Sequence, residues 1–301
     1  MKVLVTGASG LIGSALCDAL LARDDEVVAL SRDPERARGA RHGIVWHRWE
    51  PTLERPPASA FDGVDGVVHL LGEPIDQRWT DQAKERIMET RRTGTRNLVA
   101  AIAGLERKPS VLVSQSAVGF YGDRGDAVVD ETTGPGTSFD SEVVQAWERA
   151  AREVDGTGVR LAILRSGQIL DPQGGMLAEL LPPFRLGVGG PLAGGAQYVS
   201  WIHRDDEVGL LLWALDREEA SGTLNATAPN PASNRDFSKA LGRALGRPAI
   251  APVPGFVLDL KFGREFGAVL RGGQRVVPKR ALELGYEFRH PDLDEALRDL
   301  L

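Results

Sequence analysis

The chain has 301 residues, 42% of them hydrophobic, with a formal net charge of -6 at pH 7 and a sequence pI near 5.5. This size suits one nucleotide-binding domain with a smaller lobe better than two independent domains. The acidic balance argues against nucleic acid or an anionic membrane as partner, because phosphate binding needs a local excess of lysine and arginine. We therefore expect a small-molecule substrate.

Cysteine usage and the N-terminus bear on where the protein works. Cys17 is the single cysteine, so neither a disulfide framework nor a thiolate metal site can be built. No apolar stretch is long enough for a signal peptide or a membrane span. The five histidines show no metal-ligand spacing and no convincing carboxylate cluster. These features predict a cytoplasmic protein with no membrane partner and no metal.

Short apolar runs alternate with helical periodicity in the first half of the chain. Strands are predicted at 2–6, 26–31, 44–47, 66–71, 110–114 and 159–164, and helices at 11–23, 80–104 and 138–155. Alternating strands and helices imply parallel pairing with right-handed crossovers. The predicted fold class is α/β, a Rossmann doubly wound and mainly parallel sheet with a smaller C-terminal substrate lobe.

The composition changes after Arg165, because glycine and proline crowd residues 167–195, which predicts loops over a cleft. Three further elements are predicted, namely a strand at 197–202, a helix at 205–215 and a strand at 223–226. We expect residues 1–168 with 198–224 to form the nucleotide-binding domain. Residues 169–197 with 225–301 should form the substrate lobe, including a small C-terminal domain.

Three glycines lie where the first strand turns into the first helix. Such a triplet allows a sharp turn, a close approach of backbone to a pyrophosphate, and close packing of the helix on the sheet. The phosphates should sit at the helix N-terminus, where free N–H groups and the helix dipole favour negative charge. The predicted cofactor contacts in this turn are Gly7, Ser9, Gly10, Leu11, Ile12 and Gly13.

The end of the second strand distinguishes two nicotinamide cofactors. An NAD site usually places a carboxylate here, whereas this chain has Ser31 and Arg32 followed by Asp33. Arg32 can donate paired hydrogen bonds to a 2′-phosphate and Ser31 can add a hydroxyl donor. Asp33 could instead bind an unphosphorylated ribose. The arginine favours NADP(H) as the cofactor.

Several segments together resemble one enzyme family. Besides the glycine turn, they are the segments at 114–122 and 201–206 and the unusual stretches at 71–75, 182–187 and 272–278. With these segments the chain is similar to the extended short-chain dehydrogenases/reductases, and more closely to an NAD(P)-dependent epimerase-like subfamily that ends in a small domain of unknown function. The resemblance covers essentially the whole chain.

The resemblance implies further cofactor contacts. Residues after the fourth strand should lie near the nicotinamide-side ribose, and the turn at 165–169 should approach the nicotinamide. The contacts expected from these parts are Leu71, Gly72, Glu73, Ser114, Arg165 and Gln168. A homodimer formed through the helices at 80–104 and 138–155 is also a family-style expectation.

Extended family members use a serine or threonine, then a tyrosine and a lysine four residues apart on the next helix. Ser116 matches the serine position best and Ser114 is the alternative, although either could simply satisfy backbone groups of a turn. The tyrosine and lysine pair is absent. Aligned on Glu148, the pair would fall on Asp140 and Val144.

The sequence therefore leaves four candidates for the residue that moves the proton, namely Tyr121, Glu73, Asp140 and His203. Tyr121 could act as an acid or pack, Glu73 would need burial to raise its pKa, Asp140 could be a solvated helix-start carboxylate, and His203 could mark a helix entry. With Ser116 and Tyr121 as the catalytic candidates, we predict an NADP(H)-dependent oxidoreductase or epimerase-like enzyme for a small carbonyl or sugar-like compound. The alternative is a non-catalytic NADP(H)-binding sensor or regulatory protein.

Overall fold

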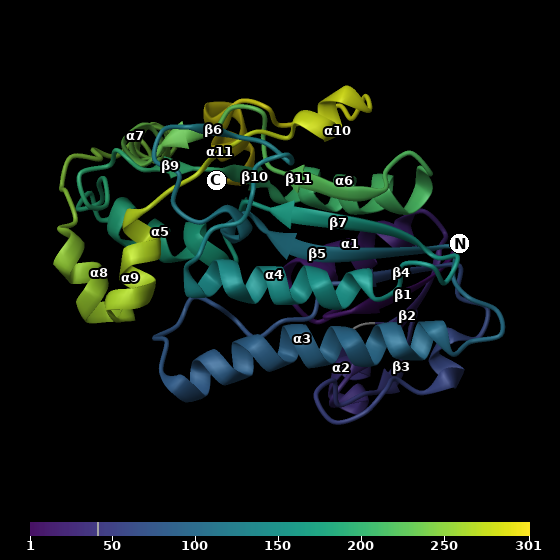
Figure 1. Ribbon diagram of the computed structural model, residues 1–301. Helices are drawn as coiled ribbons and strands as arrows, with labels where there is room; N and C mark the ends of the chain where they lie inside the picture. The colour runs from purple at the N-terminus through teal and green to yellow at the C-terminus, as the bar shows by residue number, and fades with distance from the viewer. Residues whose placement is uncertain (41) are drawn as a thin grey trace.

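The computed structural model describes residues 1–40 and 42–301, and within these ranges a seven-stranded parallel sheet forms the centre (Figure 1). The strand order is β11-β7-β5-β4-β1-β2-β3. The strands are β1 (Lys2–Thr6), β2 (Glu26–Ser31), β3 (Ile44–Arg48), β4 (Gly66–His69), β5 (Val111–Ala117), β7 (Arg160–Ser166) and β11 (Gly222–Ala226). The doubly wound fold class is confirmed, and β5 runs further than predicted, so that Ser116 lies inside the strand.

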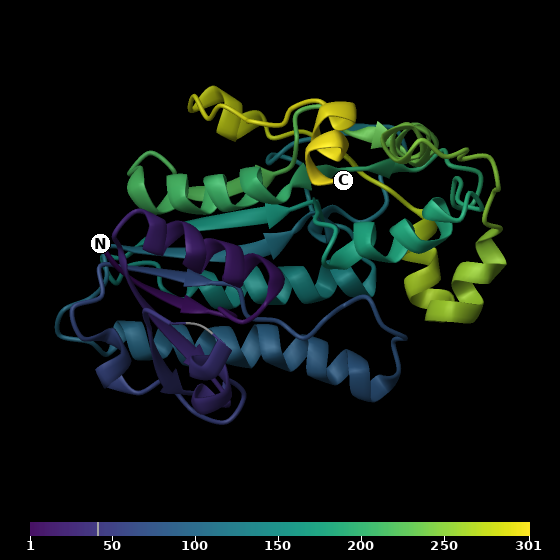
Figure 2. The same ribbon diagram turned by 180° about the vertical axis from the view of Figure 1, so that it is seen from behind.

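Helices cover both faces of this sheet. The helices α1 (Leu11–Ala22) and α6 (Arg204–Asp216) lie on one face, which Figure 2 shows in front, and α3 (Asp81–Ala103) and α4 (Phe139–Arg152) cover the other. Strand side chains alternate between the two cores. Burial on both faces explains the continuous apolar runs. Among the described residues, no helix combines the length and apolar character needed to span a membrane.

The smaller lobe lies at the carboxyl ends of the strands (Figure 1). Its own core includes Leu170, Trp201, Phe237 and Leu297. Its elements are β8 (Gln168–Leu170), α5 (Gly175–Arg185), β9 (Tyr198–Val199), β10 (Trp201–His203), β12 (Ala232–Ser233), α7 (Asn234–Leu245), α8 (Gly255–Phe262), α9 (Arg264–Arg271), β13 (Arg275–Val276), α10 (Lys279–Glu283) and α11 (Leu293–Leu300). The short elements left are α2 (Pro34–Ala40), β6 (Val128–Val129) and the 3-10 turns η1 (Ala58–Phe61) and η2 (Val118–Tyr121).

The expected loops at 167–195 are partly wrong, because this stretch contains the helix α5. Leu177, Leu181 and Phe184 are buried and recur at helical spacing, so their packing in the lobe core outweighs the two prolines in the last turns. The predicted strand at 197–202 is likewise divided at Ser200 into β9, paired with β12, and β10, paired with β8. The division into domains by residue range stays a proposal.

A buried carboxylate ties the C-terminal segment to α6. Asp206 is fully buried and accepts backbone N–H groups from Arg289 at 2.8 Å and His290 at 2.9 Å. The hydroxyl of Tyr286 donates to the Asp206 carbonyl oxygen at 3.2 Å. Because an unpaired buried carboxylate is costly, these bonds fix the position of the C-terminal segment against the start of the helix.

Candidate functional site

The glycine turn after β1 leaves room for a phosphate at the start of α1. Gly7 has a φ of 68°, and a Cβ there would lie 2.8 Å from the Leu70 carbonyl oxygen. A Cβ on Gly13 would lie 2.1 Å from the Gly7 carbonyl oxygen, so this close approach requires glycine. Gly10 caps α1 without a side-chain hydrogen bond. The first helical amides are therefore open to an anion.

The rest of the turn faces the lobe. Ser9 is exposed, Leu11 is half-buried and Ile12 is buried. A groove of about 1010 Å³ begins at this turn and continues between α1 and α6. The lobe approaches closely here, since a Cβ on Gly174 would lie 3.0 Å from the Leu11 side chain. The glycine turn and the smaller lobe are therefore in direct contact.

At the end of β2, local hydrogen bonds distinguish Arg32, the candidate for binding a 2′-phosphate, from Asp33, the candidate for binding an unphosphorylated ribose. Ser31 Oγ accepts the Asp33 N–H at 3.1 Å, and Asp33 Oδ1 accepts the Arg36 N–H at 3.1 Å. Asp33 is thereby used at the start of α2. Arg32 is exposed at the same edge as the glycine turn. This arrangement suits a phosphate better than a bare ribose.

The segment after β4 contacts an arginine of α3, Arg91. Leu71 is half-buried and Gly72 is exposed, and a Cβ on Gly72 would lie 2.9 Å from the guanidinium carbon of Arg91. Arg91 donates to the Glu73 carbonyl oxygen at 2.8 Å and lies over the Trp147 ring at 5.0 Å. Burial lowers the pKa of Arg91 to about 10. Arg91 thereby links α3 to the segment after β4 and to α4.

A buried histidine supports the turn from below. His69 Nδ1 lies 2.8 Å from Thr6 Oγ1, and its Nε2 lies 2.8 Å from Thr95 Oγ1. Burial lowers the pKa of His69 to about 3, so the ring is neutral. The ends of β1 and β4 are thereby fixed to α3, and the glycine turn rests on a rigid base.

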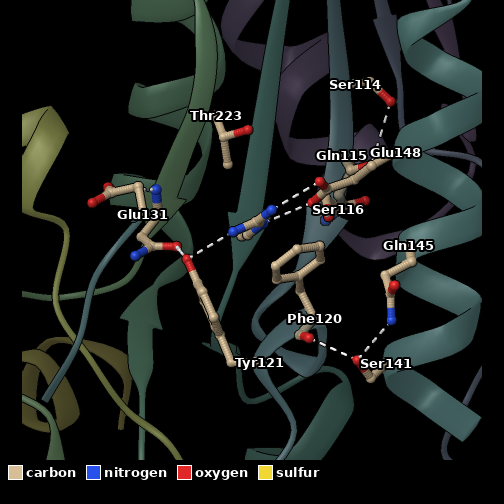
Figure 3. A network of polar contacts seen from close by, with 12 residues as sticks. Ser114, Gln115, Ser116, Phe120, Tyr121, Glu131, Ser141, Gln145, Glu148 and Thr223 are labelled. Atoms are coloured by element: carbon tan, nitrogen blue, oxygen red, sulfur yellow. Dashed lines mark hydrogen bonds and ion pairs between the residues drawn. The ribbon is translucent and has the colours of Figure 1, made fainter. Parts of the chain in front are cut away.

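The carboxyl ends of β5, β7 and β11 hold a buried polar network. Arg165 donates from Nε to Glu148 Oε1 at 2.7 Å and from Nη2 to Glu148 Oε2 at 2.9 Å. Ser116 Oγ donates to the same Glu148 at 2.7 Å. On the other side, Arg165 Nη1 donates to the Tyr121 hydroxyl at 3.0 Å, and that hydroxyl donates to Asn225 Oδ1 at 2.7 Å. Figure 3 shows Ser116 and Glu148 together on one side of the network and Tyr121 on its opposite side.

This network includes three of the predicted site residues, Ser116, Tyr121 and Arg165, and a fourth, Ser114, lies beside it and donates to the Gln115 carbonyl oxygen at 3.4 Å. Ser114, Ser116, Tyr121 and Arg165 are all buried, and the Arg165 guanidinium also stacks on the Phe120 ring at 3.4 Å. Burial raises the pKa of Tyr121. In this arrangement neither the Ser116 nor the Tyr121 hydroxyl is directed at the cleft. Their catalytic roles, and a cofactor contact through the Arg165 side chain, would need a rearrangement and stay predictions.

The two remaining predicted cofactor contacts, Gln168 and Glu73, lie in different environments. Gln168 is exposed at the start of β8. Glu73 Oε1 accepts from Arg86 and from Gln77, each at 3.4 Å, so its carboxylate is held at the surface. The structure thus brings the glycine turn, Arg32, Gly72 and Gln168 to one edge of the sheet, whereas it holds the serines and Tyr121 inside.

Asp140 has the most unusual environment of the four candidates for proton transfer. It lies in the first turn of α4 and its side chain is 4% exposed. Among the described residues its Oδ1 has no hydrogen-bond partner, and its Oδ2 would lie 3.2 Å from a Cβ on Gly119. Burial raises its pKa. The expected solvated carboxylate is wrong, because Gly119 lets the η2 turn cover this side chain.

His203 lies in a cluster that the sequence did not suggest. His203, Asp205 and His290 bring candidate ligand atoms within 4.8 Å of one another, although the sequence predicted no convincing carboxylate cluster around these histidines. The two rings are stacked 3.8 Å apart, however, and His203 Nδ1 accepts the Asp205 N–H at 3.0 Å. Stacked rings cannot both direct a lone pair at one ion. His203 is a helix cap, in agreement with the helix-entry reading.

Two family models match the chain. The NAD dependent epimerase/dehydratase family matches residues 3–226, and the Domain of unknown function (DUF1731) matches residues 253–300. The chain therefore belongs to the NAD dependent epimerase/dehydratase family. The predicted resemblance, including the terminal domain of unknown function, is confirmed, and so is a nicotinamide nucleotide as the cofactor of the family.

Individual relatives are similar over the whole length. "Epimerase family protein SDR39U1" from Homo sapiens is 38% identical over 306 residues, which cover 100% of both chains. A crystal structure of the human epimerase family protein SDR39U1 (isoform2) with NADPH aligns with a TM-score of 0.90 and 36% identity, over 100% of this chain and 99% of that one. UDP-glucuronic acid 4-epimerase from Bacillus cereus, at 19% identity and a TM-score of 0.79 over 100% and 98%, shares the fold.

Proposed function

We propose that this protein is an NADP(H)-dependent oxidoreductase or epimerase-like enzyme that acts on a small carbonyl or sugar-like compound. The observation that carries the proposal is the edge formed by the glycine turn and Arg32. The turn offers unpaired helix amides to a pyrophosphate, Arg32 offers a guanidinium to a 2′-phosphate, and Asp33 is engaged elsewhere. The human relative that was crystallised with NADPH supports the same cofactor.

The residues present fit this nucleotide. Gly7 and Gly13 exclude Cβ atoms where the backbone must approach a phosphate, and Gly72 does so beside the expected ribose. When bound, NADPH supplies a hydride to the substrate. The chain itself has to orient the substrate oxygen and provide its proton.

Asp140 is the acid that the geometry favours. It lies at the cleft end of α4, on the position expected for the family's tyrosine. Burial raises its pKa, which favours the protonated form that a general acid needs, and one of its oxygens is unpartnered among the described residues. The η2 turn, which covers this side chain, would have to move before Asp140 could give its proton to a developing alkoxide. Ser116, if its hydroxyl leaves Glu148, would orient the substrate oxygen.

The alternative of a non-catalytic NADP(H)-binding sensor has its own support. The tyrosine and lysine pair is missing, and the hydroxyls of Ser116 and Tyr121 are already bonded inside the protein. Such a protein would bind NADPH and turn over nothing. The two functions therefore differ in chemistry and agree in cofactor binding.

The first experiment titrates the purified chain with NADPH and NADH, comparing wild type with Arg32→Ala. Loss of a charge-assisted phosphate contact should weaken NADPH binding about tenfold to a hundredfold and leave NADH unchanged. Arg36→Ala is the matched control, because it removes an exposed arginine four residues further along, in α2, and it should bind both nucleotides like wild type. Equal affinity of wild type for both nucleotides would exclude the NADP(H) preference.

The second experiment follows NADPH oxidation with a panel of carbonyl compounds. Asp140→Asn and Ser116→Ala should lower turnover about a hundredfold or more while NADPH affinity is retained. Glu142→Gln, an acid in the same helical turn, is the control and should keep turnover. Tight NADPH binding with no turnover on any compound would favour the sensor.

Location and assembly follow the same reasoning. We propose a cytoplasmic protein and a homodimer formed through α3 and α4, with no nucleic acid and no membrane as partner. The low content of basic groups relative to acidic ones supports the last point. Sedimentation of the purified chain tests the dimer, and a monomer at micromolar concentration would exclude it.

A further inference from the structure

A second polar chain lies on the face of the sheet opposite the Arg165 network. Neighbouring strand residues point to opposite faces, so Arg165 is directed at α4 and Ser166 at α6. Ser166 Oγ donates to Glu207 Oε1 at 2.6 Å, and Gln115 Nε2 approaches Ser166 Oγ to 3.5 Å. Gln115 is half-buried at the end of β5. The chain therefore leads from the cleft edge to a buried acid.

Glu207 has no counter-charge of the kind that Glu148 has. Its side chain is 0% exposed, and among the described residues its Oε2 has no hydrogen-bond partner. Burial raises the pKa of Glu207 to about 7. As a neutral acid it accepts the Ser166 hydrogen bond without a buried charge, whereas ionisation would leave a carboxylate unpaired in the core.

The charged residues near Glu207 do not supply it with a counter-charge. On the elements packed against α6 and on α6 itself they include Asp18 of α1, Arg160 and Arg165 of β7, His203 of β10, Arg204, Asp205 and Asp206 of α6, and Tyr286 and Arg289 of the C-terminal segment. Arg165 is bound to Glu148 across the sheet, and Arg204 is bound to Asp171. Asp206 uses its carboxylate on two backbone amides, and burial raises the pKa of the Tyr286 hydroxyl, which stays neutral. No cation in the described part of the chain pairs with Glu207.

We propose that Glu207 is a positioning residue, which in its protonated form orders the nicotinamide end of the cofactor site through Ser166 and Gln115. The inference rests on the proposed function, because it needs NADP(H) to extend across the turn at 165–169. Ionised Glu207 adds a negative charge beneath that turn and disturbs the start of α6 and the end of β7. Both effects oppose an anionic nucleotide, so NADPH affinity falls as the pH rises.

The test measures the NADPH dissociation constant from about pH 6 to about pH 9, a range that spans the pKa of a buried carboxyl. If only the protonated form binds well, the wild-type constant rises roughly tenfold per pH unit above the pKa. Glu207→Gln keeps the shape and the Ser166 hydrogen bond but cannot ionise, so its profile should lack this rise. The difference between the two profiles is the readout, because the nucleotide phosphate titrates in both.

Two further variants make the result specific. Ser166→Ala interrupts the chain and should reduce the pH dependence as Glu207→Gln does. Asp25→Asn removes another buried acid, which pairs with the N-terminal amine, and should keep the wild-type profile. Infrared spectra without nucleotide test the protonation itself, since wild type should show a carboxylic acid band at about pH 6 that Glu207→Gln lacks.

The possible outcomes distinguish a failure of this inference from a failure of the proposed function. Parallel profiles for wild type and Glu207→Gln overturn this inference alone, whereas a protein that binds no NADPH in any form overturns the proposed function as well. If Glu207→Gln does not fold, the infrared titration of wild type replaces it, and a carboxyl already ionised at about pH 6 overturns the inference.

Discussion

The glycine turn and the Arg165 network lie at the same edge of the sheet but are built in opposite ways. The turn is one contiguous stretch, 7–13, and it offers backbone amides and positions without side chains. The network joins residues up to 104 positions apart and works through buried charge and hydroxyl groups. The comparison teaches that the proposed binding surface is a local property of the chain, whereas its support depends on complete folding.

The largest expected effect comes from removing the charge of the network. Arg165→Met leaves Glu148 buried without its partner, which should cost about 3–5 kcal/mol in the free energy of unfolding. Chemical denaturation measures it. Arg152→Met is the matched control, since Arg152 reaches the same carboxylate at 3.7 Å but is 42% exposed, and it should cost under about 1 kcal/mol. Equal costs for the two variants would show that burial does not govern this pair.

A buried acid without a guanidinium should behave differently with pH. Folding raises the pKa of Glu207 from 4.5 to about 7, so its contribution to stability is complete below pH 4.5 and is lost as the pH rises through 7. Glu207→Gln avoids this loss and should gain up to about 3 kcal/mol relative to wild type above neutral pH. Denaturation at acidic and alkaline pH measures the difference, and a constant difference would contradict a raised pKa.

The turn should respond to a single methyl group. A Cβ on Gly13 would meet the Gly7 carbonyl oxygen, so Gly13→Ala should displace α1, cost about 1–3 kcal/mol and abolish NADPH binding. Gly39→Ala is the control, because its Cβ would meet nothing within 4 Å. Thermal unfolding and nucleotide titration measure both variants. NADPH binding retained by Gly13→Ala would mean that the turn is not the phosphate site.

The smallest effect should come from a single hydroxyl of the network. Tyr121→Phe leaves Arg165 Nη1 and Asn225 Oδ1 each without one bond, which should cost about 1–2 kcal/mol. If Tyr121 has no catalytic role, turnover per folded molecule stays at the wild-type level. A loss of turnover without a loss of stability would restore Tyr121 as a catalytic residue.

Much of the fold could be predicted because its signals are local. Every strand of the central sheet overlaps a predicted one, since strands buried on both faces are apolar throughout and are separated by helical periodicity. The helix α5 was missed because glycines and prolines at 167–195 obscured the spacing of Leu177, Leu181 and Phe184. Only their burial in the lobe core stabilises that helix.

The amino-acid sequence by itself determined the parallel sheet, the glycine turn, the arginine after β2 and the family, because periodicity, turn chemistry and contiguous motifs are properties of neighbouring residues. The tertiary structure alone decided which polar groups are buried and paired. It placed Glu148 against Arg165, left Glu207 without a cation and covered Asp140 with the η2 turn. Desolvation and ion pairing depend on contacts between segments that are distant in the sequence, and these contacts cannot be predicted from the residue types along the chain.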